Sequence, residues 1–211
     1  MDLKGISADL QRRFDAKMAA RERALPAARR AIRSSANAIR AIHRGEAAEA
    51  ERLMEDAAEA LAEGEGAVAE HPDVRYAGFL HDAQKEYAEA RLTEAVLRGK
   101  DFPPPEEVGV TPAAYLNGMS EAIGECRRAV LDLLRGGDVP RAEELLQSMD
   151  DMYYVLVSMD YPDAITGNLR RSTDVARSII EKTRGDLSVS LVQKDLRDAL
   201  ERHAEEFRGD G

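Results

Sequence analysis

Cysteine, tryptophan and long apolar segments are rare or missing in this sequence. Its one cysteine, Cys126, cannot form a disulfide within the chain, and no metal site can use several thiolates. No apolar run approaches the roughly 18 residues of a membrane-spanning helix, and the N-terminus lacks the apolar core of a signal peptide. We therefore expect a cytoplasmic protein with no membrane partner.

The short motifs of common enzyme classes are also missing. The sequence has no G-x-x-x-x-G-K-[ST] loop for nucleotides, no H-E-x-x-H pair for zinc and no G-x-S-x-G turn for a serine nucleophile. Its four histidines are scattered along the chain, which argues against a zinc site built on local sequence. Carboxylates remain as the candidates for chemistry.

Charge is distributed unevenly along the chain. The net charge is −10, but residues 1–44, a basic N-terminal arm, carry eleven lysines and arginines against four acidic residues. Residues 45–73 carry ten acidic residues and one basic residue, Arg52. A basic arm on an acidic body predicts either an anionic partner for the arm or packing of the arm against the acidic surface of the protein itself.

The spacing of apolar residues predicts helix almost throughout and no strand. Pro26 is expected to kink or divide the first helix, and Thr111 to cap the helix that begins at Pro112. With no internal repeat and short connections, we expect one all-α domain over residues 1–211, a seven-helix bundle. The expected helices cover about residues 6–43, 46–69, 74–97, 112–134, 140–158, 164–183 and 188–207.

Three carboxylates share one face of the third expected helix. Asp82, Glu86 and Glu89 follow at spacings of four and three, so they form an acidic stripe beside the apolar face. Like charges at these spacings repel one another. A solvated surface is the ordinary explanation of such a stripe, and half of a metal site is the alternative.

Two further carboxylates stand where a simple surface interpretation is strained. Glu125 lies on the side of its helix that carries Gly118 and Ala122, small residues that let a neighbouring helix approach closely. Asp151 lies in a helix that is apolar on nearly all sides, which predicts a central place in the bundle. A buried carboxylate needs a partner or a metal ion, so an arginine salt bridge and metal binding both remain open.

Together, Glu86, Glu89, Glu125 and Asp151 would form a set of oxygen ligands from three helices. Carboxylates this close would repel one another and raise one another's pKa values unless a cation bound between them. Oxygen-only ligands suit Mg²⁺, with Mn²⁺ as the alternative, and these ions activate water for phosphodiester cleavage. We take all four as candidate metal ligands, and Glu86, Glu89 and Asp151 as the candidate catalytic residues.

The basic arm contains arginines at regular helical spacing, which we call the arginine stripe. Guanidinium groups in such a row can bind phosphates through two hydrogen bonds each. Arginine stems that cover apolar surface are the alternative, and no double-stranded DNA reading module is present. The stripe consists of Arg29, Arg33, Asn37, Arg40 and Arg44, with Arg30 and His43 at its edges.

Several stretches, in this order, resemble the translin/TRAX family of all-α nucleic-acid-binding proteins. They are "ARRAIRSSANAIRAIHRGE", "KEYAEA", "AAYLNGMSEAIGECRR", "LLQSMDDMYYVLVSM" and "NLRRSTDVARSIIEKTRGDL". The resemblance covers most of the chain and implies a seven-helix subunit that assembles into hollow homo-oligomers, hexamers or octamers. It also implies binding of single-stranded RNA and single-stranded DNA.

The resemblance further implies an endoribonuclease site, because TRAX-type subunits cut single-stranded RNA with acidic residues and Mg²⁺. Glu86 and Glu89 match two glutamates of the third helix, and Glu125 matches a glutamate of the fourth. Asp151 matches an aspartate of the fifth helix, with Asp150 as the other candidate for that position. We therefore expect a magnesium-dependent endoribonuclease. The alternative is a non-catalytic oligomer that binds single-stranded nucleic acid.

Overall fold

The computed structural model describes the backbone of residues 2–209 and the side chains up to residue 205. Over this range the chain is helical and has no strand, which confirms the expected all-α fold. No helix in this range is long and apolar enough to cross a membrane. The long helices are α1 (Leu3–His43), α2 (Ala47–Ala67), α4 (Phe79–Leu97), α6 (Pro112–Gly136), α7 (Val139–Val157) and α9 (Leu169–Gly209). Single-turn helices join them: α3 (Pro72–Arg75), α5 (Pro105–Val108) and α8 (Asp163–Thr166).

The expected break between residues 183 and 188 is wrong, because the last two expected helices are one continuous helix, α9. Gly185 in the sequence Arg-Gly-Asp does not interrupt it. Arg127 of α6 spans this point, since its guanidinium donates to Thr183 Oγ1 at 3.0 Å and to Asp186 Oδ2 at 2.8 Å. Contacts on both sides of the glycine therefore hold the helical turn in place.

Pro26 does not divide α1, which continues through it. Pro26 is exposed, whereas Ala24, Ala27 and Ala28 beside it are buried. Packing on the buried side keeps the helix continuous although proline removes one backbone donor. The third expected helix is instead shortened at its start, because Gly78 adopts a φ of 100° between α3 and α4. That left-handed conformation favours glycine.

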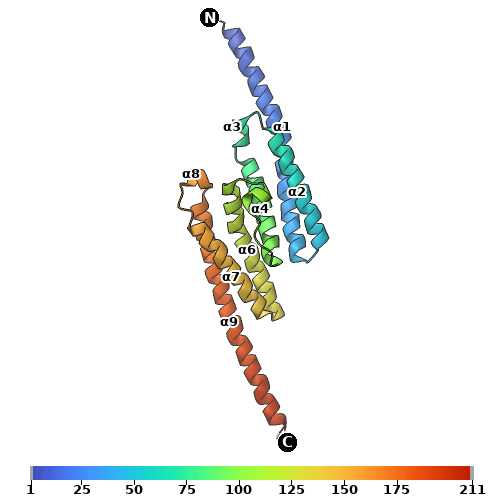
Figure 1. Ribbon diagram of the computed structural model, residues 1–211, viewed down its shortest axis with the longest axis vertical. Helices are drawn as coiled ribbons and strands as arrows, with labels where there is room; N and C mark the ends of the chain where they lie inside the picture. Colours follow the sequence, from blue (N-terminus) through green and yellow to red (C-terminus); the bar gives the residue numbers. More distant parts are fainter. Residues whose placement is uncertain (1, 210–211) are drawn as a thin grey trace.

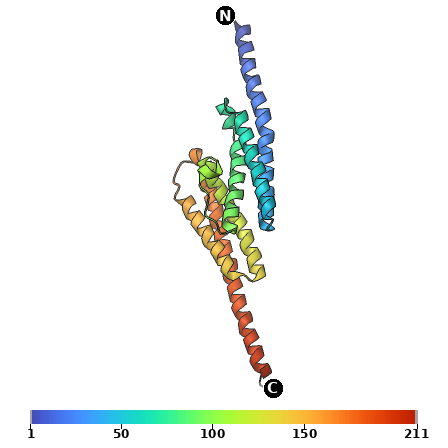
Figure 2. The same cartoon turned by 45° about the vertical axis from the view of Figure 1, so that its right-hand side comes forward.

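The long helices pack as a succession of neighbours (Figures 1 and 2). α1 lies against α2 and α4, α4 lies against α6, and α6 lies against α7 and α9. Alanines such as Ala24, Ala31, Ala57 and Ala60 are fully buried in α1 and α2, so these helices pack through small side chains. α4 and α6 stand in the middle of the succession, and their contact positions the candidate site.

The N-terminal part of α1 and the C-terminal part of α9 extend beyond the bundle at opposite ends (Figure 1). Both extensions carry exposed apolar side chains at helical spacing. These apolar stripes consist of Leu3, Ile6, Leu10, Phe14 and Met18 on α1, and of Val189, Val192, Leu196 and Leu200 on α9. A large exposed apolar surface is uncommon on a monomer and marks an interaction site.

Candidate metal and nucleic-acid site

The backbones of α4 and α6 approach each other closely at Gly118. A Cβ atom at this position would lie 2.7 Å from the carbonyl oxygen of Lys85 and 2.9 Å from the backbone nitrogen of Glu89. Only glycine permits this approach. The sequence predicted a close helix contact along the row of small residues that contains Gly118, and the structure confirms it. The contact brings one face of α6 against the acidic stretch of α4.

Three carboxylates lie together at this contact, and we call them the acidic trio. Glu86 and Glu89 of α4 and Glu121 of α6 each offer one oxygen atom, and these three atoms lie within 4.8 Å of one another. Among the residues that the structure describes, no other group of three histidine, cysteine or acidic side chains lies close enough to hold a metal ion. The structure therefore brings the two predicted α4 glutamates together with one that was not predicted.

Sequence reasoning missed Glu121. It lies one helical turn before Glu125, in the stretch that resembles the translin/TRAX family. A spacing of four places Glu121 and Glu125 on the same side of α6. That spacing is the signal that could have found it, since the stripe on α4 was recognised by the same rule.

Lys85 lies beside the acidic trio and partly neutralises it. Its Nζ donates a hydrogen bond to Glu121 Oε1 at 2.7 Å and lies 3.6 Å from Glu86 Oε1. Glu89, which is 8% exposed, has neither a hydrogen bond nor an ion pair with any described residue. When all three carboxylates are ionised, one ammonium leaves two negative charges, which one divalent cation would balance.

Burial and crowding raise the pKa values of the two α4 carboxylates. Burial, followed by the nearby charges of Glu121 and Glu86, raises the pKa of Glu89 to about 8. Burial also raises the pKa of Glu86, although Lys85 opposes the change. Burial alone would lower the pKa of Lys85, but the hydrogen bond to Glu121 and the surrounding negative charge raise it. The trio is thus electrostatically unsatisfied without a further cation.

Glu125 lies next to the trio and joins it to α1. His43 Nε2 and Glu125 Oε2 are 2.5 Å apart, and the imidazole is almost fully buried. This hydrogen bond lowers the pKa of Glu125, against the opposing effect of burial. The negative charge of Glu125 also contributes to the raised pKa of Glu89. Glu125 is therefore a neighbour of the trio whose carboxylate is held by His43.

Asp151 does not join the carboxylates, which contradicts its expected place in the set. It is exposed on α7, and its Oδ1 accepts a hydrogen bond from Gln147 Nε2 at 2.9 Å. Its neighbour Asp150 forms an ion pair with Arg184 of α9 at 2.8 Å. The prediction failed because α7 is not central. One side of it packs on the bundle, and Asp151 lies on the other.

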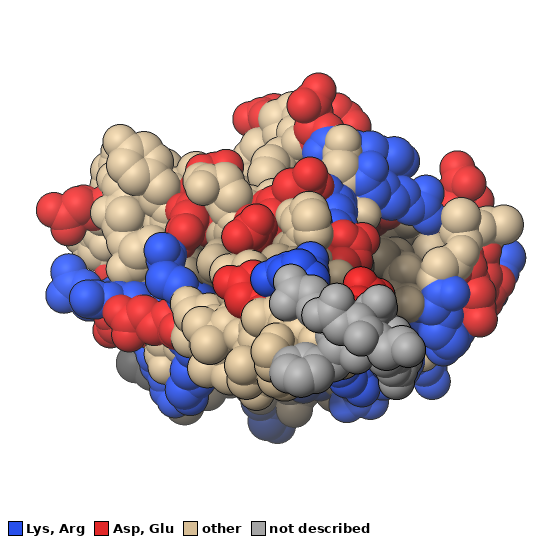
Figure 3. Space-filling model, turned by 90° about the horizontal axis from the view of Figure 1, so that it is seen from below, with Lys and Arg blue, Asp and Glu red and all other residues tan. Residues whose placement is uncertain are grey.

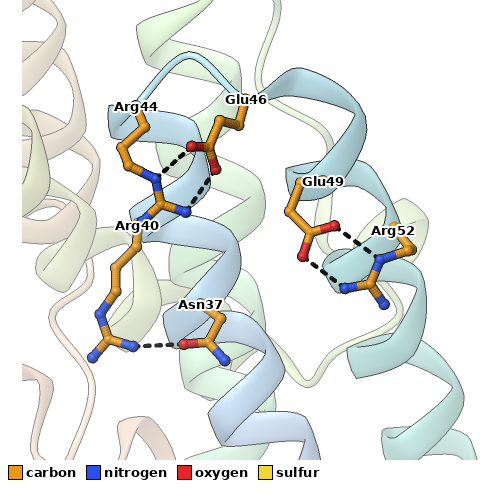
Figure 4. A network of polar contacts seen from close by, with 6 residues as sticks. All are labelled: Asn37, Arg40, Arg44, Glu46, Glu49 and Arg52. Carbon is orange, nitrogen blue, oxygen red and sulfur yellow. Dashed lines mark hydrogen bonds and ion pairs between the residues drawn. The ribbon is translucent and has the colours of Figure 1, made fainter.

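Arg30, at the edge of the arginine stripe, and Arg44, its last member, are bound by acidic side chains of the same chain. Arg30 forms an ion pair with Glu63 of α2 at 2.6 Å. Arg44 donates two hydrogen bonds to Glu46, at 2.8 and 2.6 Å (Figure 4). The expectation that the arm packs against the acidic surface of the protein thus holds for these two residues.

The remaining arginines of the stripe have no ion pair with any described acidic residue. Arg40 donates to the neutral amide oxygen of Asn37 at 2.6 Å (Figure 4). Arg29 and Arg33 are exposed and have no ion pair with any described residue. Seen from the end at which α9 projects, acidic and basic side chains are interspersed over the surface (Figure 3). Within the arginine stripe, free positive charge therefore lies at Arg29, Arg33 and Arg40.

The chemistry of the acidic trio fits a magnesium ion. Ligand oxygens lie about 2.1 Å from Mg²⁺, so opposite ligands of one ion are about 4.2 Å apart. The oxygens of the trio are within 4.8 Å, and small side-chain rotations close the difference. All donors are carboxylate oxygens, which are the ligands that Mg²⁺ and Mn²⁺ prefer. Glu86, Glu89 and Glu121 are the residues that would hold the ion.

An open cavity of about 400 Å³ lies beside the trio. Glu89 and Glu121 form part of its lining, together with Ser120 of α6. The first turns of α9 form the facing wall. This cavity gives a bound molecule access to two members of the trio.

No family model matches the sequence. A curated relative, an uncharacterized protein of Methanocaldococcus jannaschii, is 31% identical over 128 residues, which span 60% of this chain and 57% of that protein.

Solved structures resemble the chain over most of its length. The structure of AfC3PO in a complex with duplex RNA has a TM-score of 0.81 and 35% sequence identity, and the match covers 88% of this chain and 96% of that chain. A second structure, the crystal structure of AfC3PO, has the same TM-score and identity and is covered over 97% of its length. Apo-NeC3PO, at 20% identity and a TM-score of 0.75, shares the fold. These C3PO structures are of the translin/TRAX type, and the chain therefore belongs to the translin/TRAX family.

Proposed function

We propose that this protein is a homo-oligomeric, RNA-binding, magnesium-dependent endoribonuclease. The observation that carries the proposal is the acidic trio, with Glu89 buried and unpaired beside an open cavity. A structural carboxylate in such a place normally has a partner. The relationship to AfC3PO, which has been solved with duplex RNA, supports RNA as the substrate class.

In this proposal, different residues of the chain have different roles. Glu86, Glu89 and Glu121 hold the ion, and His43 orients Glu125 beside them. When bound, Mg²⁺ lowers the pKa of a water nucleophile and stabilises the leaving oxygen. Hydrolysis would form a P–O bond from water to the phosphorus atom and break the P–O bond to one ribose oxygen, which would take up the proton that the water loses. Arg29, Arg33 and Arg40 bind backbone phosphates away from the cut.

Single-stranded RNA is the proposed substrate, and single-stranded DNA is a proposed further ligand. The free arginines on α1 contact phosphates and carry no base-reading geometry. Binding should therefore depend steeply on salt, by about 0.7 in the logarithmic slope for each phosphate contact. The double variant Arg29→Ala/Arg33→Ala should lose about two such contacts. Fluorescence anisotropy with a labelled oligonucleotide in EDTA measures this slope for single-stranded and duplex RNA alike.

The proposed homo-oligomer rests on the apolar stripes of α1 and α9. Their side chains are exposed in a single subunit, although burying them would be favourable at about 25 cal/mol per Å². A second copy of the chain could cover these stripes, because it offers apolar surface of the same kind. A hexamer or an octamer is the expected assembly.

Cleavage of a labelled single-stranded RNA, with Mg²⁺ or with EDTA, tests the enzymatic part. We expect cleavage in Mg²⁺ alone, and a loss of about 100-fold or more for Glu89→Gln and for Glu121→Gln. Asp151→Asn is the matched control, because it makes the same kind of change at an exposed carboxylate outside the trio. Equal rates for Glu121→Gln and Asp151→Asn would refute the site.

A non-catalytic RNA-binding oligomer is the second candidate, and Lys85 favours it. Its ammonium already lies between Glu86 and Glu121, as in a purely structural charge cluster. Under this alternative the oligomer binds RNA equally in Mg²⁺ and EDTA and leaves it intact. Isothermal titration with Mg²⁺ separates the candidates further. A metal site should give a heat of binding that Glu89→Gln abolishes, whereas a structural cluster should give no such heat.

A further inference from the structure

The wall of the open cavity that faces the acidic trio is built from the first turns of α9. It consists of Arg171, Ser172, Val175 and Ile179. Spacings of four place Arg171, Val175 and Ile179 on one side of the helix. A cationic group and two apolar side chains therefore face Glu89 and Glu121 across a space of about 400 Å³. That volume is within the range of small-ligand sites.

The position of this wall is fixed by hydrogen bonds. Asn117 of α6 donates to the carbonyl oxygen of Thr166 at 2.7 Å, and its own amide oxygen accepts from Ser172 Oγ at 3.2 Å. Asn117 is buried, with 4% of its surface exposed. The start of α9 is thus attached to the helix that carries Glu121, and the two walls keep a defined separation.

Arg171 is a free cation on this wall. It forms no hydrogen bond or ion pair with any described residue, although two carboxylates line the same cavity. Arg184, farther along α9, is by contrast paired with Asp150 of α7. Arg171 also stands in the first turn of a long helix, where the helix dipole favours anions. It can therefore bind an anionic group that enters the cavity.

We infer that this cavity is a nucleotide subsite, in which Arg171 holds the phosphate next to the one that is cut. The inference rests on the proposed function and adds a residue to it. A ligand of this cavity must tolerate carboxylates on one wall, bind a cation on the other and cover apolar side chains. A nucleotide of an RNA strand has this composition, since metal-bound phosphate, free phosphate and base are adjacent along it.

Within this subsite Val175 and Ile179 contact the base or its ribose. Their side chains have no hydrogen-bonding groups, so they give contact area without reading the base edge. The subsite therefore accepts all four bases. Arg171 is a positioning residue, because it fixes the register of the strand while the trio lies at the bond that is cut.

Substitution of Arg171 tests the subsite, with Arg170→Ala as the matched control. Arg170 is also exposed and lies one residue earlier, but it lines a different cavity. For Arg171→Ala we expect kcat/KM for single-stranded RNA to fall about 10- to 100-fold, as for a lost charged hydrogen bond. Arg171→Lys should recover part of the loss, because lysine keeps the charge without the two-pronged geometry. Arg170→Ala should stay within about twofold of the parent.

A neutral methylphosphonate next to the scissile phosphate gives the second arm of the test. In the parent protein, kcat/KM for this substrate should fall by the same factor as the substitution Arg171→Ala causes with ordinary RNA. In Arg171→Ala, the methylphosphonate should cause no further fall in kcat/KM. RNAs with each of the four bases at this position should be cut at similar rates. In EDTA, binding of the RNA should also discriminate against methylphosphonate in the parent and not in Arg171→Ala.

The outcomes separate the inference from the function on which it rests. If the parent does not cut RNA in Mg²⁺, the proposed function fails. If the parent cuts and Arg171→Ala matches Arg170→Ala, the subsite is overturned. If Arg171→Ala and the methylphosphonate lower kcat/KM by independent factors that multiply, the subsite is overturned too. Such a result would mean that Arg171 does not contact that phosphate.

Discussion

At the scale of single residues, Glu89 makes the stability of the metal-free protein depend on pH. Its pKa is raised from 4.5 to about 8, so the folded protein keeps a proton there that the unfolded chain loses. The folded state is therefore favoured at low pH, and this contribution declines as pH rises from about 4.5 to about 8. Above that range the carboxylate is charged in both states, and its burial is a net cost.

Glu89→Gln should remove this dependence, because glutamine stays neutral at every pH. In EDTA we expect the melting temperature of the variant to exceed that of the parent by several degrees at pH 9, and the two to converge near pH 5. Thermal denaturation followed by circular dichroism gives both curves. Asp151→Asn serves as control. Parallel curves for parent and Glu89→Gln would count against a buried, unpaired carboxylate.

The same scale shows what sequence spacing can and cannot predict. Glu86 and Glu89 were identified from their spacing and from the family resemblance, and the structure places them together. Asp151 was assigned to the site because its helix looked apolar on nearly all sides. A helical wheel tells which residues share a face, but only the neighbours of α7 decide which face is covered. For Glu121 the spacing of four from Glu125 was a usable signal, but its contact with the two α4 glutamates appears only in the fold.

At the scale of helices, the distance between α4 and α6 depends on Gly118. A Cβ atom there would meet backbone atoms of α4 at 2.7 and 2.9 Å, and backbone cannot rotate away as a side chain can. Gly118→Ala should therefore separate the helices and destabilise the fold by about 1–3 kcal/mol. It should also weaken Mg²⁺ binding, because the trio is shared between the two helices.

Gly124→Ala is the control for this prediction. Gly124 lies in the same helix, and its nearest contact would be Ile179 Cδ1 at 4.0 Å. There alanine should be neutral or stabilising by up to about 1 kcal/mol, since glycine weakens a helix interior. Urea denaturation measures both variants. Similar stabilities for Gly118→Ala and Gly124→Ala would show that the helices can separate without cost.

Helix boundaries were predicted well where a cap or a proline at the first turn marked them. Thr111 caps α6 as expected, accepting a hydrogen bond from the backbone of Ala114. Breaks inside helices were predicted poorly. Pro26 and Gly185 have the local signals of an interruption, but contacts from outside the helix override them. Such contacts involve residues far apart in sequence, so local pattern cannot reveal them.

At the scale of the whole molecule, the apolar stripes predict how subunits associate. Phe14→Glu on α1 and Leu196→Glu on α9 each place a charge in a stripe that association would bury, so each should shift the protein toward smaller species. Light scattering coupled to size exclusion measures the mass. Ala16→Glu, exposed on α1 outside the stripe, should leave the mass unchanged. A parent that is already monomeric, or variants of unchanged mass, would contradict a role for the stripes.

The acidic trio lies on two long helices, and the chain between them, residues 98–111, takes no part in it. Natural variation in that connection can therefore be large without moving a single carboxylate. Relatives with very different connections should still superimpose at Glu86, Glu89 and Glu121, because their positions depend on how two helices touch.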